Sequence, residues 1–151
     1  MTRAQKAKEY FLQGYNCAQS VAMAFDDLIG MDKDRIAKLT SGFGGGIGRM
    51  REVCGTVTGA AFVISALYGY NDPKATIEKQ KLYANIQQIG NEFAKENGSV
   101  VCRELLGLSI KGADSPTPEA RTQQYYQKRP CADLVEYSAH LVEEFIKNKE
   151  K

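Results

Sequence analysis

The sequence has little of what histidine-based metal sites and haem attachment require. His140 is the only histidine among 151 residues, which excludes any metal site that needs two histidines. No C-x-x-C-H motif is present, so attachment of a c-type haem is excluded as well. Cys131 precedes His140 by nine residues, about 13 Å along one helix and too far for a direct hydrogen bond within it. We therefore expect no haem and no Cys-His hydrolase site on this helix.

The chain also lacks a strong charge of either sign and a clear membrane segment. Its 20 basic and 18 acidic residues give a net charge of +2, and no basic stripe is present, so we expect no nucleic-acid partner. The N-terminal segment has no apolar stretch of the signal-peptide type. The longest uncharged stretch, residues 53–71, is interrupted by Gly, Thr, Ser and Asn, so we expect no membrane insertion. The expected location is the cytoplasm, where structural disulfides are rare.

Strand-like alternation is absent, and the apolar residues recur at helical spacing. The length suits one domain, residues 1–151. We predict an all-α chain, a compact bundle of about six to seven helices. The expected helices cover residues 2–13, 17–29, 32–39, 53–70, 74–96, 101–106 and a last helix from 130 onward, with a short additional helix after Pro118 in a polar connection.

Several details of these helices follow from local signals. Asn16 is a good N-cap for the second helix, whose apolar stripe is expected to continue through Phe25 to Leu28, with Gly30 ending the helix. Asn71 and Asp72 predict a turn, with Pro73 at the start of the next helix. The last helix is predicted to bury a stripe made of Cys131, Leu134, Val135, Ser138, Leu141, Val142 and Phe145.

Four cysteines occupy the same kind of position. Cys17, Cys54, Cys102 and Cys131 each fall in the first turn of an expected helix, where unpaired N–H groups and the helix dipole favour the thiolate. Arginines lie nearby in the sequence: Arg49 and Arg51 before Cys54, Arg103 after Cys102, and Arg129 before Cys131. These positions predict redox-active thiols that could also bind a metal, with Cys54 the most reactive.

Glycines concentrate around Cys54. Five of the chain's fourteen glycines lie in GFGGGIG, residues 42–48, and Gly55 and Gly59 follow on one face of the next helix. A glycine-rich loop can direct several N–H groups to one point, and a bare helix face lets a backbone or a cofactor approach closely. The spacing fits neither a dinucleotide-binding fingerprint nor a P-loop. The residues expected to contact a cofactor are Gly44, Gly45, Gly46, Gly55 and Gly59.

These segments together resemble the C_GCAxxG_C_C family of redox-active proteins. The resemblance rests on NCAQSV around Cys17, on GFGGGIGR and EVCGTVTGAA around Cys54, on CRELLG at Cys102 and on CADLV at Cys131. It implies a small helical protein with four functional cysteines. A similar module lies beside haem-binding segments in split-Soret cytochromes, which suggests electron transfer involving iron. Thr56 departs from the alanine of the family's CGAxxG form.

Three functions and one structural alternative remain open. Four thiolates satisfy the ligand count of an iron–sulfur cluster in an electron-transfer protein, although the usual ferredoxin spacings are absent. Two cysteine pairs could instead act as a metal-free thiol–disulfide redox protein. The third function is a helical binding module with structural zinc, and the structural alternative is four buried thiols that act only as core residues. We expect an unidentified redox partner protein, and the sequence leaves a homo-oligomer open.

Overall fold

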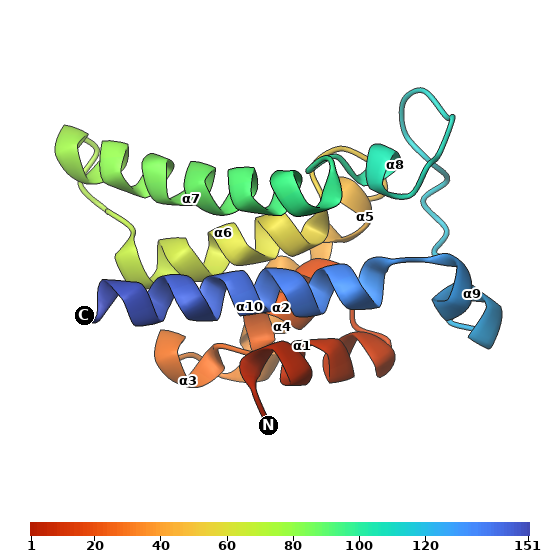
Figure 1. Ribbon diagram of the computed structural model, residues 1–151, viewed down its shortest axis with the longest axis horizontal. Helices are drawn as coiled ribbons and strands as arrows, with labels where there is room; N and C mark the ends of the chain where they lie inside the picture. Colours follow the sequence, from red (N-terminus) through yellow and green to blue (C-terminus); the bar gives the residue numbers. More distant parts are fainter.

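The computed structural model describes all 151 residues and is built of helices joined by turns and loops (Figure 1). The helices are α1 (Arg3–Leu12), α2 (Cys17–Met23), α3 (Asp26–Ile29), α4 (Lys33–Thr40), a 3-10 turn (Ser41–Phe43), α5 (Gly44–Ile47), α6 (Gly55–Tyr68), α7 (Thr76–Asn97), α8 (Cys102–Leu105), α9 (Gln123–Lys128) and α10 (Cys131–Lys149). The all-α prediction is confirmed, since the β pairing is limited to an isolated bridge between Val53 and Val101. The expected six to seven helices are too few, because the predicted helix 17–29 is divided into α2 and α3, and a single turn, α5, forms in the glycine loop.

The long helices lie side by side along the molecule. In Figure 1, α7, α6 and α10 run along the long axis with α1 on the far side of α10. α10 packs against both α1 and α6, and α2 packs against α6. The core between them is aliphatic and aromatic, and Phe11, Phe25, Val63, Val135 and Val142 are at most 1% exposed. Removing this apolar surface from water is the main force that holds the helices together.

The second helix is shorter than predicted. α2 ends at Met23, α3 begins at Asp26, and Leu28 is 40% exposed instead of continuing the buried stripe. The guanidinium of Arg3 explains the break, because it donates to the Ala24 carbonyl at 2.9 Å and to Asp27 at 2.6 Å. An external donor to this carbonyl lets the chain change direction after Phe25 without leaving a buried acceptor unpaired.

Local capping signals fix most of the other helix ends. The side chains of Asn16 and Gln19 form a reciprocal capping box at the start of α2, as an N-cap asparagine allows. Gly30 and Gly98 end their helices in the left-handed conformation. The prediction of a helix start at Pro73 is wrong: the Asp72 side chain accepts the Lys74 N–H in a local turn, and α7 begins at Thr76.

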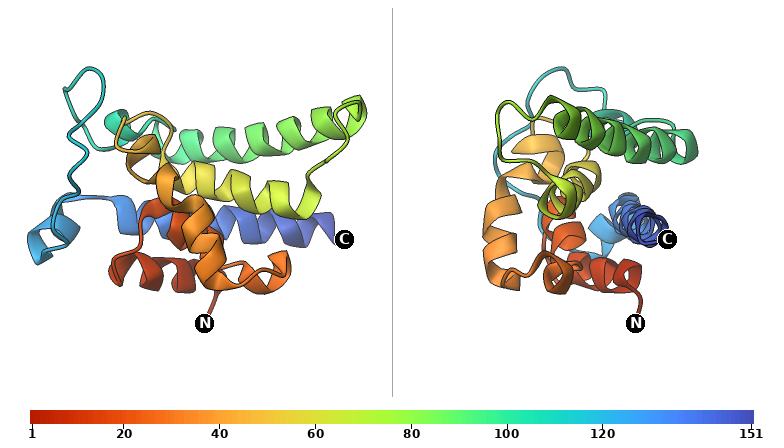
Figure 2. Two further views of the ribbon diagram at one scale, coloured as in Figure 1. Left: turned by 180° about the vertical axis from the view of Figure 1, so that it is seen from behind. Right: turned by 90° about the vertical axis from the view of Figure 1, so that its left-hand side faces the viewer.

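One end of the molecule collects the elements that carry the cysteines. Both α6 and α10 begin there, α7 ends there, and α5, α8 and α9 are grouped around them (Figure 1). The loop of residues 106–122, between α8 and α9, stands out at the same end (Figure 2). None of the helices combines the length and apolar content needed to cross a membrane.

Candidate functional site

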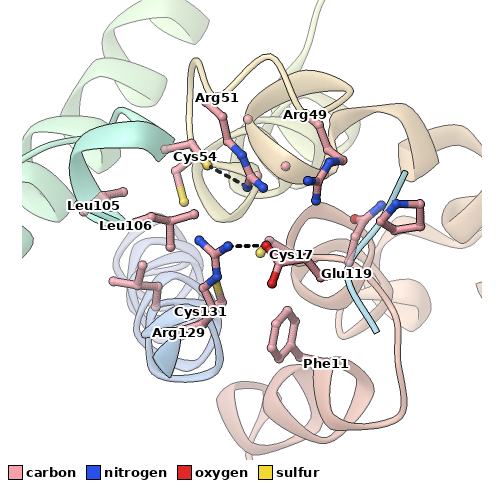
Figure 3. A pocket seen from close by; sticks show the side chains of 18 of the residues that line it. Phe11, Cys17, Arg49, Arg51, Cys54, Leu105, Leu106, Glu119, Arg129 and Cys131 are labelled. Atoms are coloured by element: carbon pink, nitrogen blue, oxygen red, sulfur yellow. Dashed lines mark hydrogen bonds and ion pairs between the residues drawn. The ribbon is translucent and has the colours of Figure 1, made fainter. Parts of the chain in front are cut away.

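All four cysteines lie at helix starts, as predicted. Cys17, Cys102 and Cys131 are the first residues of α2, α8 and α10, and Cys54 is the N-cap of α6. The four thiols are free and line a single cavity of about 310 Å³ (Figure 3). Cysteines that are far apart in the sequence therefore share one site at one end of the helices.

Cys17 and Cys131 form one pair, at the starts of α2 and α10. A hydrogen bond between their thiols raises the pKa of Cys17 and lowers the pKa of Cys131. The positive charges of Arg129, Arg121 and Arg51 act in the same direction on the Cys131 pKa. Cys131 therefore becomes the thiolate first, and Cys17 keeps its proton and donates it.

Cys54 and Cys102 form the second pair, which depends on the isolated bridge. The Cys54 N–H donates to Val100 at 2.7 Å and the Cys102 N–H donates to Glu52 at 2.6 Å, on either side of Val53 and Val101. Successive side chains alternate faces in such a pairing, so the two cysteines are diagonal neighbours on the same face. Both side chains are buried.

Arg51 connects this second pair to the loop of residues 106–122. Its guanidinium donates to Cys102 Sγ at 3.6 Å and to Asp114 Oδ2 at 3.0 and 3.1 Å. Arg51 is only 5% exposed and has a φ of +59°, a left-handed conformation that non-glycine residues seldom adopt. The sequence indicated Arg51 as a neighbour of Cys54, whereas its hydrogen bond goes to Cys102.

The other three arginines near the cysteines in the sequence make their polar contacts elsewhere. Arg103 donates to the carbonyls of Met50 and Ile110, and so binds the glycine loop to the segment after α8. Arg49 pairs with Asp114 and Arg129 with Glu119. Both Arg49 and Arg129 still line the cavity, where they contribute positive charge close to the sulfurs.

The expectation that Cys54 is the most reactive thiol stays a prediction, although its burial disfavours the thiolate. Burial raises the pKa of Cys54 to about 11, although hydrogen bonding from Thr56 opposes the shift. The hydroxyl Oγ1 of Thr56 lies 3.2 Å from Cys54 Sγ. Desolvation is the largest cause of this shift and outweighs the effect of the helix start. Cys131, with its lowered pKa, is the favoured thiolate.

The glycines divide between lining the cavity and packing helices. Gly44, Gly45, Gly46 and Gly55 line the cavity, whereas Gly59 does not. A side chain on Gly46 would place its Cβ 2.6 Å from the Cβ of Cys102. At Gly59 a Cβ would lie 2.8 Å from the Ala18 carbonyl oxygen, so this glycine allows α2 to cross close to α6. Contact between these glycines and a cofactor stays a prediction.

Sequence reasoning missed the part of the site that comes from the loop of residues 106–122. Arg121 donates to the carbonyls of Phe11 and Tyr15 at 3.0 Å each, and its guanidinium lies 4.3 Å from the Phe11 ring. These contacts hold the loop against the end of α1, beside Cys17. Burial raises the pKa of the neighbouring Tyr125 to about 12. No motif marks these residues, because their role depends on contacts more than a hundred positions apart.

The four thiols line one cavity but do not converge on one point. No three His, Cys, Asp or Glu side chains are placed to hold one ion together, whereas a mononuclear zinc site needs four ligands around one point. In an iron–sulfur cluster the cysteines bind different iron atoms and do not converge on one point. Four thiols that line one cavity supply the number of thiolates that a cluster needs.

Comparison with known proteins identifies a family. The family model described as "Putative redox-active protein (C_GCAxxG_C_C)" matches residues 15–145, which include all four cysteines and the glycine loop. No curated protein and no solved structure matches the chain. Because the match covers most of the 151 residues, the protein belongs to the C_GCAxxG_C_C family of four-cysteine, redox-active proteins.

Proposed function

We propose that the protein is an electron carrier whose four cysteines hold an iron–sulfur cluster in the cavity and exchange electrons with a partner protein. The observation that carries the proposal is that Cys17, Cys54, Cys102 and Cys131 all line this one cavity. Four thiolates are the ligand set of the common two-iron and four-iron clusters. When bound, such a cluster supplies reversible one-electron transfer.

The charge of the cavity supports an anionic occupant. Four guanidinium groups line it, those of Arg49, Arg51, Arg121 and Arg129, against one carboxylate, that of Glu119. Asp114 pairs with Arg49 and Arg51 and adds a second carboxylate, so four positive and two negative groups leave a surplus of +2. Four thiolates around an iron–sulfur core carry net negative charge, which this surplus would offset.

The chain's own residues have distinct roles in this proposal. The four cysteines would ligate iron, and the helix starts that carry them favour the thiolate form. Arg51 and Thr56 donate hydrogen bonds to the sulfurs of Cys102 and Cys54. Arg121 would hold the loop of residues 106–122, which lines the cavity, against the end of α1. Such outer contacts orient ligands and set the potential.

A metal-free thiol–disulfide function is the second candidate, and one observation favours it. Cys17 and Cys131 share a hydrogen bond, and their pKa values shift in opposite directions. A thiolate beside a protonated thiol is the arrangement expected of a dithiol that can form a disulfide. In that case the second pair, Cys54 and Cys102, would form a separate disulfide.

Single Cys→Ser variants at the four positions distinguish the two candidates. Protein prepared without oxygen would be analysed for iron, sulfide, visible absorption and free thiols. Under the cluster proposal the wild type contains iron and sulfide, and each of the four substitutions weakens or abolishes both. Thr58→Val, which changes a part-buried side chain on α6 without touching a sulfur, is the matched control and should retain full iron content.

Other outcomes would overturn the cluster proposal. Colourless wild type that takes up no iron on reconstitution, with disulfides lost in the pairs Cys17–Cys131 and Cys54–Cys102, would leave the dithiol function. If neither iron nor a disulfide forms and the variants differ from wild type only in stability, the cysteines serve as core residues and both redox functions fail.

A further inference from the structure

The two cysteine pairs differ in the hydrogen bonds that other side chains donate to them. Thr56 Oγ1 lies 3.2 Å from Cys54 Sγ, and Arg51 donates to Cys102 Sγ at 3.6 Å. Both donors are buried: Thr56 is 0% exposed and Arg51 is 5% exposed. The donors on the second pair thus come from outside the four cysteines, whereas Cys17 and Cys131 bond to each other.

Chemistry fixes the direction of the bond between Thr56 and Cys54. A thiolate or an iron-bound cysteine sulfur carries no proton, so it can only accept, and the hydroxyl must donate. The Thr56 hydroxyl has Cys54 Sγ as its partner, and burying a hydroxyl without a partner would be unfavourable. The backbone of Thr56 is held as well, because the Ser138 hydroxyl donates to its carbonyl at 2.8 Å. The donor is therefore aimed at the sulfur and locked in place.

We propose that Thr56 is a positioning residue that raises the reduction potential of the cysteine site by donating a hydrogen bond to Cys54 Sγ. The inference rests on the cluster form of the proposed function, in which Cys54 Sγ is an iron ligand without a proton. Reduction of such a cluster would add negative charge that its cysteine sulfurs share. A donor aimed at Cys54 Sγ becomes stronger with that charge, so it stabilises the reduced state.

The size of the effect follows from the kind of bond. A hydrogen bond to a charged group is strong enough to change an equilibrium by about tenfold or more. For a one-electron centre a tenfold change in the reduction equilibrium corresponds to about 59 mV. Loss of the Thr56 hydroxyl should therefore lower the potential by roughly this amount if the bond strengthens fully on reduction.

The test compares midpoint potentials in anaerobic redox titrations of three α6 variants and the wild type. Thr56→Val removes the hydroxyl at nearly constant volume and should make reduction about tenfold less favourable. Thr56→Ser restores a hydroxyl and should recover most of the wild-type potential. Thr58→Val is the matched control, because the Thr58 hydroxyl donates to the Gly55 carbonyl and not to a sulfur, and its potential should be unchanged.

Iron content, free thiols and thermal unfolding of every variant keep the outcomes separate. If Thr56→Val fails to fold, Thr56→Ala tests the same loss in a smaller side chain. A wild-type potential in Thr56→Val, or an equal shift in Thr58→Val, overturns the inference while the redox function stands. A wild type that holds no iron instead overturns the proposed cluster function, and this inference with it.

Discussion

The two cysteine pairs reach the same cavity by different structural means. Cys17 and Cys131 begin helices that are packed into the core of the molecule, so their proximity depends on how α2 and α10 pack. Cys54 and Cys102 are brought together by a single backbone bridge next to the glycine loop. The two cysteines of the first pair therefore stay close as long as α2 and α10 stay packed. The two cysteines of the second pair stay close only if the local backbone geometry is kept.

The pairs also differ in how their charge is stabilised. Within the first pair the hydrogen bond from Cys17 lowers the pKa of Cys131, and Cys17 remains partly exposed. Within the second pair both thiols are buried; Cys102 accepts a hydrogen bond from Arg51, and Cys54 shares one with the Thr56 hydroxyl. The comparison teaches that a helix start alone does not determine the state of a cysteine, since desolvation and the placement of nearby donors decide it.

The largest expected effect comes from disturbing the local geometry of the second pair. In Gly46→Ala the new Cβ would lie 2.6 Å from the Cβ of Cys102 and 2.7 Å from the Glu52 nitrogen, at a φ of +68°. Gly48→Ala has a similar φ of +56°, and its nearest atom is 4.0 Å away. Both variants suffer left-handed strain of about 1–2 kcal/mol. Overpacking should cost Gly46→Ala about 1–3 kcal/mol more in the free energy of unfolding.

Urea unfolding of the two alanine variants measures this difference, and iron content reports on the site. Gly46→Ala should lose the second cysteine pair, and iron binding with it, while Gly48→Ala keeps both. Equal stabilities would show that the approach of the loop to Cys102 has no energetic consequence, and the dependence of the second pair on local geometry would then be wrong.

The next largest effect concerns thiol reactivity in the reduced, metal-free protein. With a pKa of about 11, Cys54 should be alkylated about a hundredfold more slowly at pH 8 than a free thiol of pKa about 8.5. The pKa of Cys131 is lowered, so its thiolate persists to lower pH than that of a free thiol. Peptide mass spectrometry after timed iodoacetamide pulses should show Cys131 modified before Cys54.

Cys17→Ala sharpens this test, because it removes the hydrogen-bond donor that lowers the pKa of Cys131. The rate at Cys131 should then fall at neutral pH, whereas the rate at Cys54 should stay the same. Faster modification of Cys54 than of Cys131 in the wild type would contradict the assignment of the lower thiol pKa to Cys131.

A smaller effect is expected where α2 crosses α6 and so fixes the distance between Cys17 and Cys54. In Gly59→Ala the added Cβ would lie 2.8 Å from the Ala18 carbonyl oxygen, which should destabilise the fold by about 1–3 kcal/mol. Gly90→Ala in α7 meets nothing within 4 Å and should stabilise the fold by up to about 1 kcal/mol. Thermal unfolding of both variants checks the sign, and stabilisation by Gly59→Ala would contradict a close crossing.

The smallest effect lies away from the cysteines and serves as a reference. Hydrogen bonds from Arg3 lower the pKa of Asp27 to about 2, so this pair stabilises the fold above pH about 4 and its contribution is lost as the pH falls toward 2. The Asp27 side chain is 62% exposed, so the contribution should stay below about 1 kcal/mol. Asp27→Asn should weaken the pH dependence of the free energy of unfolding in this range, without changing iron content. A change in iron content would show that the two ends of the molecule are coupled.

Helix starts and ends could be predicted from the sequence because their signals are local. Asn16 and Gly30 act within one turn of their own positions, and the structure confirms both. These signals were sufficient to place each cysteine at a helix start. The exposure of Leu28 could not be predicted, since the break before it depends on Arg3, more than twenty residues away.

The sequence was sufficient to predict most of the residues of the site, but not which of them contact one another. The four cysteines and the glycine loop were identifiable, but Arg51 could not be assigned to Cys102, because the bridge that brings them together has no sequence signal. Asp114 and Arg121 were missed because they contact residues that are far away in the sequence. Thr56 was visible only as a departure from the family motif, and its role became apparent through its distance to Cys54.

The most direct test of the central claim is a crystal structure of anaerobically prepared protein with an anomalous difference map at the iron absorption edge. We predict an iron peak inside the cavity, with Cys17 and Cys131 ligating from one side and Cys54 and Cys102 from the other. An iron peak elsewhere, or a cavity in which the four sulfurs belong to separate sites, would contradict the claim that these cysteines form one redox centre.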